Sequence, residues 1–173
     1  IAILGMNLSE VESEIKQLES TQVCEIANDN SNEQVVVSGN KDIIDTLRTN
    51  LKLKKKRGII LPVSAPFHCS LMNEAAETMK KKIQNIDFKK PIPSIISNVT
   101  AQPENKENSI KSLLVDQITS RVRWRESVNY MIGEKVNEFI EIGPGRVLSG
   151  LIKKIDRTVN VKNFSYLTDI KND

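Results

Sequence analysis

The sequence predicts an α/β fold in two parts, a βαββαβ unit over residues 1–62 and an α/β layer with a parallel sheet over residues 63–173. Two observations support this prediction. In the first part, short apolar runs and segments of helical periodicity follow the order strand, helix, strand, strand, helix, strand. That order is the signature of a ferredoxin-like subdomain. In the second part, short buried strands alternate with helices, which is typical of a parallel sheet.

The elements of the first part follow from apolar periodicity and turn residues. Each expected strand is a short apolar or β-branched run that ends at a glycine or a polar turn. Ser9, with Glu12 three residues later, has the pattern of a capping box at the start of the first helix. The expected elements, in chain order, are strand 1–4, helix 9–20, strand 23–28, turn 29–32, strand 34–38, helix 41–51 and strand 54–63.

The second part begins with a helix whose apolar residues recur every four positions, as at Leu71, Ala75 and Met79. Polar and proline-bearing segments separate the elements that follow. These are expected to be helix 71–86, strand 95–96, loop 100–108, helix 109–118, helix 124–133, strand 138–142, a glycine-proline-glycine turn at 143–145 and a helix from 146.

Composition argues against several classes of function. The net charge of +3 and the 4% of aromatic residues fall far short of the basic, aromatic-bearing face of a nucleic-acid-binding protein. Cys24 and Cys69 form no CxxC pair, so neither a zinc site nor a disulfide framework is indicated. No apolar run approaches the ~20 residues of a membrane span, and no signal peptide precedes the first strand. We therefore expect a cytoplasmic protein that binds no metal, nucleic acid or membrane.

The start of the chain suggests a piece of a longer protein. Ile1 lies inside an apolar run and no initiator methionine precedes it. The second part also reads as the later half of a sheet whose first half is absent. We expect further elements to be encoded upstream.

His68 is the single histidine of the chain and lies where a lysine-rich strand leads into a helix. Imidazole is the side chain whose unperturbed pKa lies in the physiological range, and the ends of strands are where α/β enzymes display catalytic groups. His68 is therefore the candidate for acid/base chemistry. On residue type alone, a surface or capping histidine is the alternative.

Four sequence segments carry a family resemblance. In chain order they are NDNSNEQVVVSG (28–39), LPVSAPFHCSLM (61–72), LLVDQITSRVRW (113–124) and FIEIGPGRVLSGL (139–151). Together they resemble the malonyl-CoA:acyl carrier protein transacylase family of bacterial fatty acid synthesis. The resemblance implies an α/β-hydrolase-like large domain interrupted by a ferredoxin-like small subdomain. Residues 1–62 would form the small subdomain, and residues 63–173 the C-terminal part of the large domain.

The resemblance implies an acyltransferase that moves a malonyl group from coenzyme A to a serine and then to the phosphopantetheine thiol of acyl carrier protein. The resemblance implies no metal and no cofactor, and malonyl-CoA is a substrate. His68 aligns with the catalytic histidine, which takes the serine proton and later returns one to the leaving thiol. Gln117 aligns with a glutamine whose backbone carbonyl holds the other imidazole nitrogen. A solvated residue at a helix end is the alternative for Gln117.

The nucleophile of the family is not found in this chain. It lies in a GHSLG elbow, and the sequence contains no GxSxG pentapeptide. The arginine that pairs with the malonyl carboxylate and the glutamine of the oxyanion hole are also expected upstream. We expect the chain to be inactive without its missing N-terminal half.

Residues other than His68 and Gln117 are weaker candidates for a functional role. Lys56 and Arg57 belong either to a solvated strand edge or to a surface that docks the acidic carrier protein. Asn30 lies in a family motif and is a candidate substrate contact, although Asn32 and Glu33 stand where the family has proline and glycine.

Two further motifs have a structural and a functional interpretation. Cys69 lies beside His68, but adjacent residues project in different directions, so a core thiol is favoured over a Cys/His dyad. The glycine-proline-glycine motif at 143–145 precedes a helix and could cradle a phosphate, but a structural turn is favoured.

Three functions remain open. The first is the C-terminal portion of a malonyl transferase. The second is an acyltransferase domain of a larger synthase, which would have ketosynthase or carrier sequences beside it. The third is a noncatalytic module that binds a carrier protein through the small subdomain.

Overall fold

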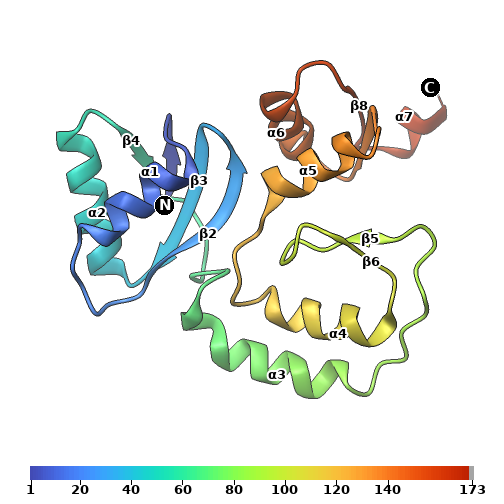
Figure 1. Cartoon of the computed structure of the whole chain (residues 1–173), viewed down its shortest axis with the longest axis horizontal. Coiled ribbons are helices and arrows are strands. Elements are labelled where there is room, and N and C mark those ends of the chain that lie inside the picture. Colours follow the sequence, from blue (N-terminus) through green and yellow to red (C-terminus); the bar gives the residue numbers. More distant parts are fainter. Residues whose placement is uncertain (172–173) are drawn as a thin grey trace. The chain divides into compact units, whose positions relative to one another are not determined.

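The computed structural model describes residues 1–171. The chain forms two compact units, the first over Ile1–Ser127 and the second beginning at Val128 (Figure 1). The predicted domain boundary between residues 62 and 63 lies inside the first unit and stays a prediction.

The first six elements form the βαββαβ unit that the sequence predicts. Their strands make one sheet in the order β2-β3-β1-β4, and all neighbouring strands are antiparallel. This arrangement is that of a ferredoxin-like subdomain, so the prediction is confirmed. The elements are β1 (Ala2–Leu4), α1 (Leu8–Lys16), β2 (Cys24–Ser31), β3 (Gln34–Gly39), α2 (Lys41–Leu53) and β4 (Arg57–Ile59).

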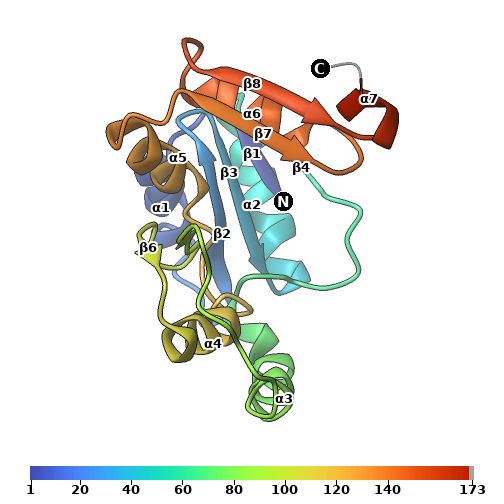
Figure 2. The ribbon, with the colours of Figure 1, turned by 90° about the vertical axis from the view of Figure 1, so that its right-hand side faces the viewer.

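Helices α1 and α2 cover one face of this sheet (Figures 1 and 2). Their apolar faces and alternate residues of the strands make one core, as period 3.6 in the helices and period 2 in the strands require. The buried members are Ile1, Ile3, Met6, Val11, Val35, Val37, Ile44, Leu47 and Leu51.

The N-cap of the first helix lies two residues earlier than its sequence pattern indicates, at Asn7 instead of Ser9. Asn7 is the N-cap: its side-chain oxygen accepts from the Glu10 N–H at 3.0 Å, and the Glu10 carboxylate accepts from the Asn7 N–H at 2.7 Å. The expected capping box of Ser9 and Glu12 is therefore wrong. The helix ends at Lys16 rather than Ser20.

Strand β2 is longer than expected, because the polar segment in which we expect a turn, residues 29–32, continues the strand to Ser31. Asp29 and Ser31 are buried there, with 0% and 1% exposure. The burial of a carboxylate in a strand depends on a partner far along the chain, which local pattern does not show. At the other end of the subdomain, α2 continues to Leu53 instead of ending at Leu51. The strand expected over 54–63 is only three residues long, Arg57–Ile59.

The rest of the first unit contains helices and one small β-ladder. Strands β5 and β6 pair with each other in antiparallel fashion, so β5 does not join a parallel sheet and the segment expected as a loop contains β6. The elements are the 3-10 helix η1 (Ser70–Met72), α3 (Asn73–Ile83), β5 (Ile95–Ile96), β6 (Pro103–Glu104), α4 (Glu107–Asp116) and α5 (Trp124–Gly133), which continues into the second unit.

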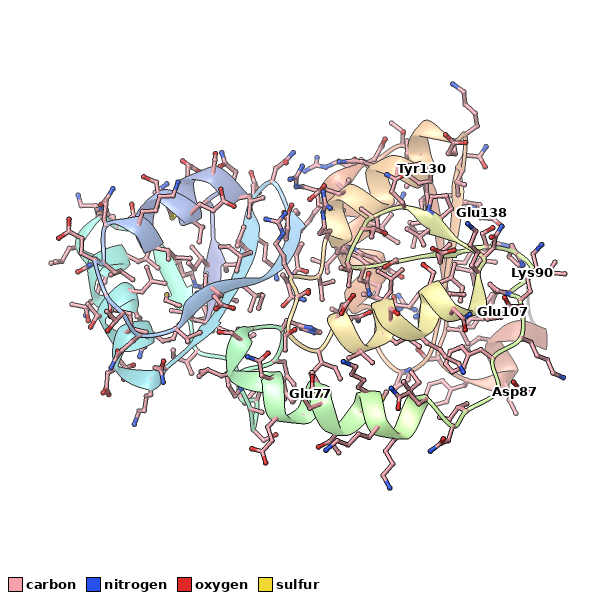
Figure 3. The ribbon with its side chains drawn as sticks, turned by 60° about the horizontal axis from the view of Figure 1, so that its bottom comes forward. Glu77, Asp87, Lys90, Glu107, Tyr130 and Glu138 are labelled. Atoms are coloured by element: carbon pink, nitrogen blue, oxygen red, sulfur yellow. The ribbon has the colours of Figure 1, made fainter. Side chains whose placement is uncertain are left out.

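Charges of both signs lie along α3, α4 and the loop between them. Glu77 is on α3, Asp87 and Lys90 lie in the following loop, and Glu107 begins α4 (Figure 3). This surface therefore has no single sign of charge.

The second unit contains the parallel pair expected of an α/β layer. Strand β7 pairs in parallel with β8, with Glu138 opposite Asn160. Helix α6 packs against both strands. The sequence pattern missed β8, in which polar and apolar residues alternate weakly. The elements are β7 (Glu138–Ile142), α6 (Val147–Ile155), β8 (Asn160–Phe164) and α7 (Leu167–Lys171).

Among the described residues, every helix is too short or too polar to cross a lipid bilayer.

Candidate active site

The imidazole of His68 is held by the end of a helix. His68 lies in the loop between β4 and η1 and is partly buried, and its Nδ1 lies 2.8 Å from the backbone carbonyl oxygen of Gln117. Gln117 is the C-cap of α4, where helix carbonyls have no partner within the helix. The contact expected between these two residues is therefore present.

This contact decides which nitrogen of His68 carries the proton in the neutral ring. A carbonyl oxygen can only accept, so Nδ1 must donate, and the lone pair is left on Nε2. Nε2 is then free to take a proton from a group that approaches it. Gln117 needs only its backbone for this role.

His68 has an unusual backbone conformation. Its φ is +63°, in the left-handed region that residues with a Cβ seldom adopt and that clusters at functional sites. Such a conformation persists only where the surrounding contacts impose it. Cys69 and Ser70, the two residues after His68, make such contacts.

Cys69 anchors the loop directly after His68. Its side chain is fully buried, and its thiol donates to the carbonyl oxygen of Pro66 at 3.1 Å. Burial raises the pKa of the Cys69 thiol, and it also raises the pKa of the Cys24 thiol, to about 11. A nucleophilic cysteine needs a lowered pKa, so the structure favours the core-thiol interpretation of Cys69.

A carboxylate from strand β2 holds the next residue. Glu25 accepts from the Ser70 hydroxyl at 2.6 Å and from the Ser70 N–H at 2.9 Å. These bonds place a negative charge at the start of η1, where helical N–H groups lack partners. Sequence reasoning missed this pair because its members lie 45 positions apart.

The segment after Gln117 is also fastened to β2. The Asp29 N–H donates to the Val122 carbonyl at 2.9 Å, and the Val122 N–H donates to the Ala27 carbonyl at 2.8 Å. Arg125 donates to the buried Asp29 carboxylate through Nε at 3.0 Å and Nη2 at 2.7 Å. Hydrogen bonding to Asp29 raises the pKa of Arg125, so the guanidinium stays charged.

Curated relatives match nearly the whole chain. The malonyl CoA-acyl carrier protein transacylase of Staphylococcus aureus (strain COL) is 41% identical over 172 residues, which are 98% of this chain and 56% of the relative. That of Bacillus subtilis (strain 168) is 42% identical over 159 residues, which are 90% of this chain and 50% of the relative. The chain is homologous to malonyl CoA-acyl carrier protein transacylases. It spans about half the length of the curated relatives it matches, and no family model matches it.

Solved transacylase structures share this fold. The acyl-carrier-protein-S-malonyltransferase of Bartonella henselae superposes with a TM-score of 0.93 at 37% identity, over 99% of this chain and 55% of that one. The malonyl CoA-acyl carrier protein transacylase of Coxiella burnetii gives 0.94 at 34% identity, over 99% and 54%. A malonyl-transacylase in complex with a type II PKS acyl-carrier protein gives 0.93 at 31% identity, over 99% and 56%. The expected mixed α/β transacylase fold is confirmed.

Asn30 is the other residue singled out by resemblance to the transacylase family. Asn30 is in β2, inside the irregularity between Asp29 and Ser31 rather than in a turn. Its predicted contact with substrate stays a prediction. Among residues 1–169, we find no group of three histidine, cysteine or acidic side chains that could hold a metal ion.

Lys56 and Arg57 lie at the edge of the small subdomain. Arg57 is exposed and begins β4, the last strand of its sheet. Lys56 is half-buried and donates to the Gly5 carbonyl at 3.3 Å. Both the edge-strand and the docking interpretations fit these positions.

The glycine-proline-glycine motif at 143–145 forms a structural turn. Gly143 and Gly145 have φ of +138° and +89°, which glycine adopts without a steric penalty. Two of the N-terminal N–H groups of α6 are already occupied, because Glu141 accepts from the Leu148 N–H at 3.0 Å and the Ser149 N–H at 2.8 Å. Burial opposes the charge of Glu141, but its hydrogen bonds with Ser149 and Leu148 lower its pKa overall. A phosphate would have to displace this carboxylate.

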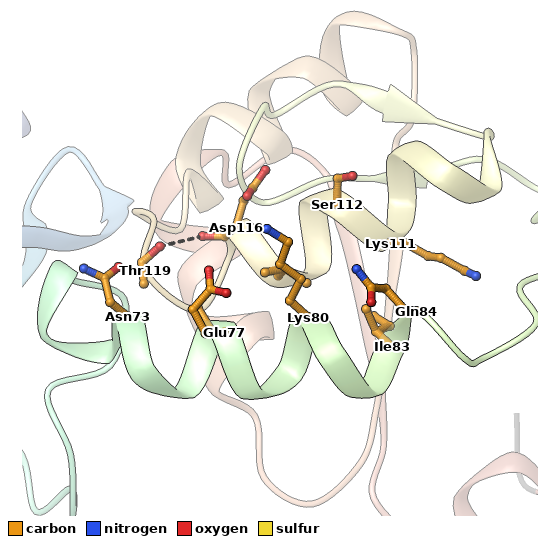
Figure 4. Close-up of a pocket in the computed structure, with 11 residues that line it drawn as sticks. Asn73, Glu77, Lys80, Ile83, Gln84, Lys111, Ser112, Asp116 and Thr119 are labelled. Atoms are coloured by element: carbon orange, nitrogen blue, oxygen red, sulfur yellow. Dashed lines mark hydrogen bonds between the residues drawn. The ribbon is translucent and has the colours of Figure 1, made fainter.

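A groove of about 430 Å³ lies between α3 and α4 (Figure 4). Its charged lining residues are Glu77 and Lys80 on α3 and Lys111 and Asp116 on α4, so the two signs balance. His68 is not among the residues that line it. The groove is therefore not where the imidazole would meet a transacylase substrate.

Proposed function

We propose that this chain supplies the general base of a malonyl-CoA:acyl carrier protein transacylase. The observation that carries the proposal is the contact between His68 Nδ1 and the Gln117 carbonyl, which leaves the Nε2 lone pair free. Sequence identity of 41% to a curated transacylase supports it. We place its action in the cytoplasm, where free thiols such as Cys24 and Cys69 persist.

The first half-reaction loads the enzyme. His68 Nε2 takes the proton of a serine hydroxyl as the oxygen attacks the thioester carbonyl of malonyl-CoA. The carbon–sulfur bond breaks, a malonyl-serine ester forms, and the imidazolium returns its proton to the coenzyme A thiolate. The Gln117 carbonyl keeps the ring oriented throughout, as the third member of a triad does.

The second half-reaction transfers the malonyl group from the serine to the thiol of acyl carrier protein, and a new thioester forms. His68 Nε2 takes the proton of the phosphopantetheine thiol of acyl carrier protein, whose sulfur attacks the malonyl-serine ester. The serine oxygen leaves and regains a proton from the imidazolium. Each half-reaction exchanges an acyl bond without redox change, so the proposal calls for no cofactor or metal.

The nucleophile must come from a segment outside this chain, because the sequence contains no GxSxG elbow. We propose that the same segment carries the oxyanion donors and the arginine for the malonyl carboxylate. This requirement gives a direct test of the function.

Joining the chain to its own upstream coding region, or to the preceding segment of the Staphylococcus aureus relative, is expected to create a transferase. The measurement is malonyl transfer from malonyl-CoA to phosphopantetheinylated carrier protein, followed by the mass of the carrier. The chain alone should transfer nothing, since it has no nucleophile.

The outcomes separate the alternatives. Carrier binding without transfer in the joined protein would favour a noncatalytic module. Ketosynthase or carrier sequences in the flanking coding region would favour a domain of a larger synthase. Transfer by a joined protein without such neighbours supports the transacylase.

We propose that Lys56 and Arg57 help to dock the carrier protein. Carrier proteins of this class are acidic, and cations at the rim of a site steer an acidic partner toward it. Replacing both residues with alanine is expected to raise the apparent KM for carrier protein roughly tenfold and to weaken its salt dependence, with little effect on KM for malonyl-CoA.

The matched control is the pair Lys81→Ala and Lys82→Ala on α3, which removes the same charge from another exposed surface. Equal kinetics in the two double variants would show that Lys56 and Arg57 form only a solvated strand edge.

A further inference from the structure

Strand β2 has two faces with different partners. Cys24 and Ile26 pack against the core under α1 and α2. Ala27 belongs to a separate buried cluster with Ala2 and Val36, and burial recurs at Ala27, Asp29 and Ser31. Because side chains alternate along a strand, Glu25 lies on the same face as Ala27, away from the helices. Register shifts between Ile26 and Asn28 and between Asp29 and Ser31 interrupt this alternation further along the strand.

Glu25, on this face, holds the loop that carries His68. Both of its carboxylate oxygens are used on Ser70, one by the hydroxyl and one by the N–H. Ser70 is two residues beyond His68, and the residue between them is the fully buried Cys69. The chain on the C-terminal side of His68 is thus fixed at two successive positions.

Asp29, four residues along the same strand, holds the segment that follows Gln117. Its carboxylate accepts three hydrogen bonds from Arg125, and its N–H binds the Val122 carbonyl. The Asp29 side chain has no exposed surface. Asn28 and Val122 also form a parallel bridge. The segment that carries Gln117 therefore meets β2 at several consecutive groups.

The two partners of the imidazole contact are 49 positions apart, and each lies next to a segment bound to the same strand. We infer that β2 aligns the His68–Gln117 hydrogen bond, with Glu25 and Asp29 as positioning residues that act through these two segments. This inference rests on the proposed role of His68 as the base. The hydrogen bonds of the two carboxylates go to Ser70 and Arg125, and the imidazole is bonded to Gln117.

The alignment matters because the contact tolerates little error. A hydrogen bond of 2.8 Å weakens steeply once its length or angle departs from the favoured range, and a displacement of 1 Å near a reacting group costs a large factor in rate. The left-handed φ of His68 adds to this demand, since a relaxed loop would turn the ring away.

The test follows the tautomer of His68 by nitrogen-15 NMR of the imidazole. The chain has one histidine, so the signal of the 173-residue protein needs no assignment, and in a longer protein it is the signal lost in His68→Gln. The wild-type ring is expected to show protonated Nδ1 and unprotonated Nε2. A released neutral ring populates both tautomers.

Glu25→Gln and Asp29→Asn are each expected to mix the two tautomers and to weaken the Nδ1–H proton signal. The matched control is Glu14→Gln, which removes the carboxylate of another ion pair in the same subdomain, 2.7 Å from Lys54, and should leave the ring signals unchanged. Unaltered ring signals in either positioning variant would overturn the role of that residue.

Milder variants keep the test decisive if a substitution prevents folding. Ser70→Ala removes only the hydroxyl bond to Glu25, and Arg125→Lys keeps the cation but loses the bidentate contact. Circular dichroism confirms the fold of each variant, and the tautomer is then scored as before.

Kinetics of the joined enzyme separate this inference from the proposed function. Glu25→Gln is expected to lower kcat roughly tenfold or more, with KM for malonyl-CoA within about twofold of wild type. A mixed tautomer with unchanged transfer would remove His68 from catalysis but leave the alignment intact. A wild-type tautomer with slow transfer would overturn the alignment.

Discussion

Replacing His68 with alanine in the joined enzyme is expected to lower the rate of malonyl transfer by ~10² or more, the usual effect of losing a general base. The reason is the geometry of the ring. Its Nδ1 is committed to the Gln117 carbonyl, so Nε2 is the acceptor that a serine or thiol proton would meet. The measurement is single-turnover transfer from malonyl-CoA, with the loading and unloading halves followed separately.

Both halves should slow, because the same nitrogen serves the serine in one and the phosphopantetheine thiol in the other. Imidazole added to the buffer should restore part of the rate in His68→Ala, since the substitution leaves space where the ring was. Near-wild-type turnover in the variant would refute the assignment of the base.

Apolar periodicity predicted the order of elements in the first subdomain because each element buries one face. The spacing of apolar residues in α2 and the β-branched run of β3 are local signals. The predicted start of α1 was wrong, since Asn7 and Ser9 are both good N-cap residues. Only the contact of Asn7 with Glu10 decides between them.

The imidazole contact was predicted through family resemblance, and no local pattern would have located it. His68 and Gln117 are 49 positions apart, and the group that holds the ring is a backbone carbonyl, which any residue type supplies. A lone histidine in a sequence therefore does not show its partner. The SAPFHC segment around His68 indicates the partner, because it identifies the family, and the family resemblance assigns the partner carbonyl to Gln117.

The partners of Glu25 and Asp29 could not be predicted. Glu25 contacts a residue 45 positions away and Asp29 one 96 positions away, and such pairs leave no periodic signal. One clue was available. A charged residue that follows apolar strand residues, as Asp29 follows Ile26 and Ala27, needs either a buried partner or a turn. The predicted turn was wrong, because the strand continues to Ser31.

The burial of Asp29 also predicts a large stability effect. Replacing Arg125 with methionine is expected to lower the free energy of unfolding by about 3 kcal/mol, because it leaves a buried carboxylate without its counter-ion while keeping most of the side-chain volume. Asp29 is fully buried and the Arg125 side chain is 24% exposed, which places the loss at the lower end for a broken buried pair. Urea unfolding followed by circular dichroism measures it.

Lys54→Met is the control for this loss. It removes the cation from an ion pair of the same 2.7 Å length, but Lys54 is 47% exposed, so its loss should stay below about 1 kcal/mol. Adding Asp29→Leu to Arg125→Met should recover much of the stability, since an apolar pair needs no counter-ion. Equal losses for Arg125→Met and Lys54→Met, or no recovery in the double variant, would show that burial of the Asp29 charge is not what makes this contact important.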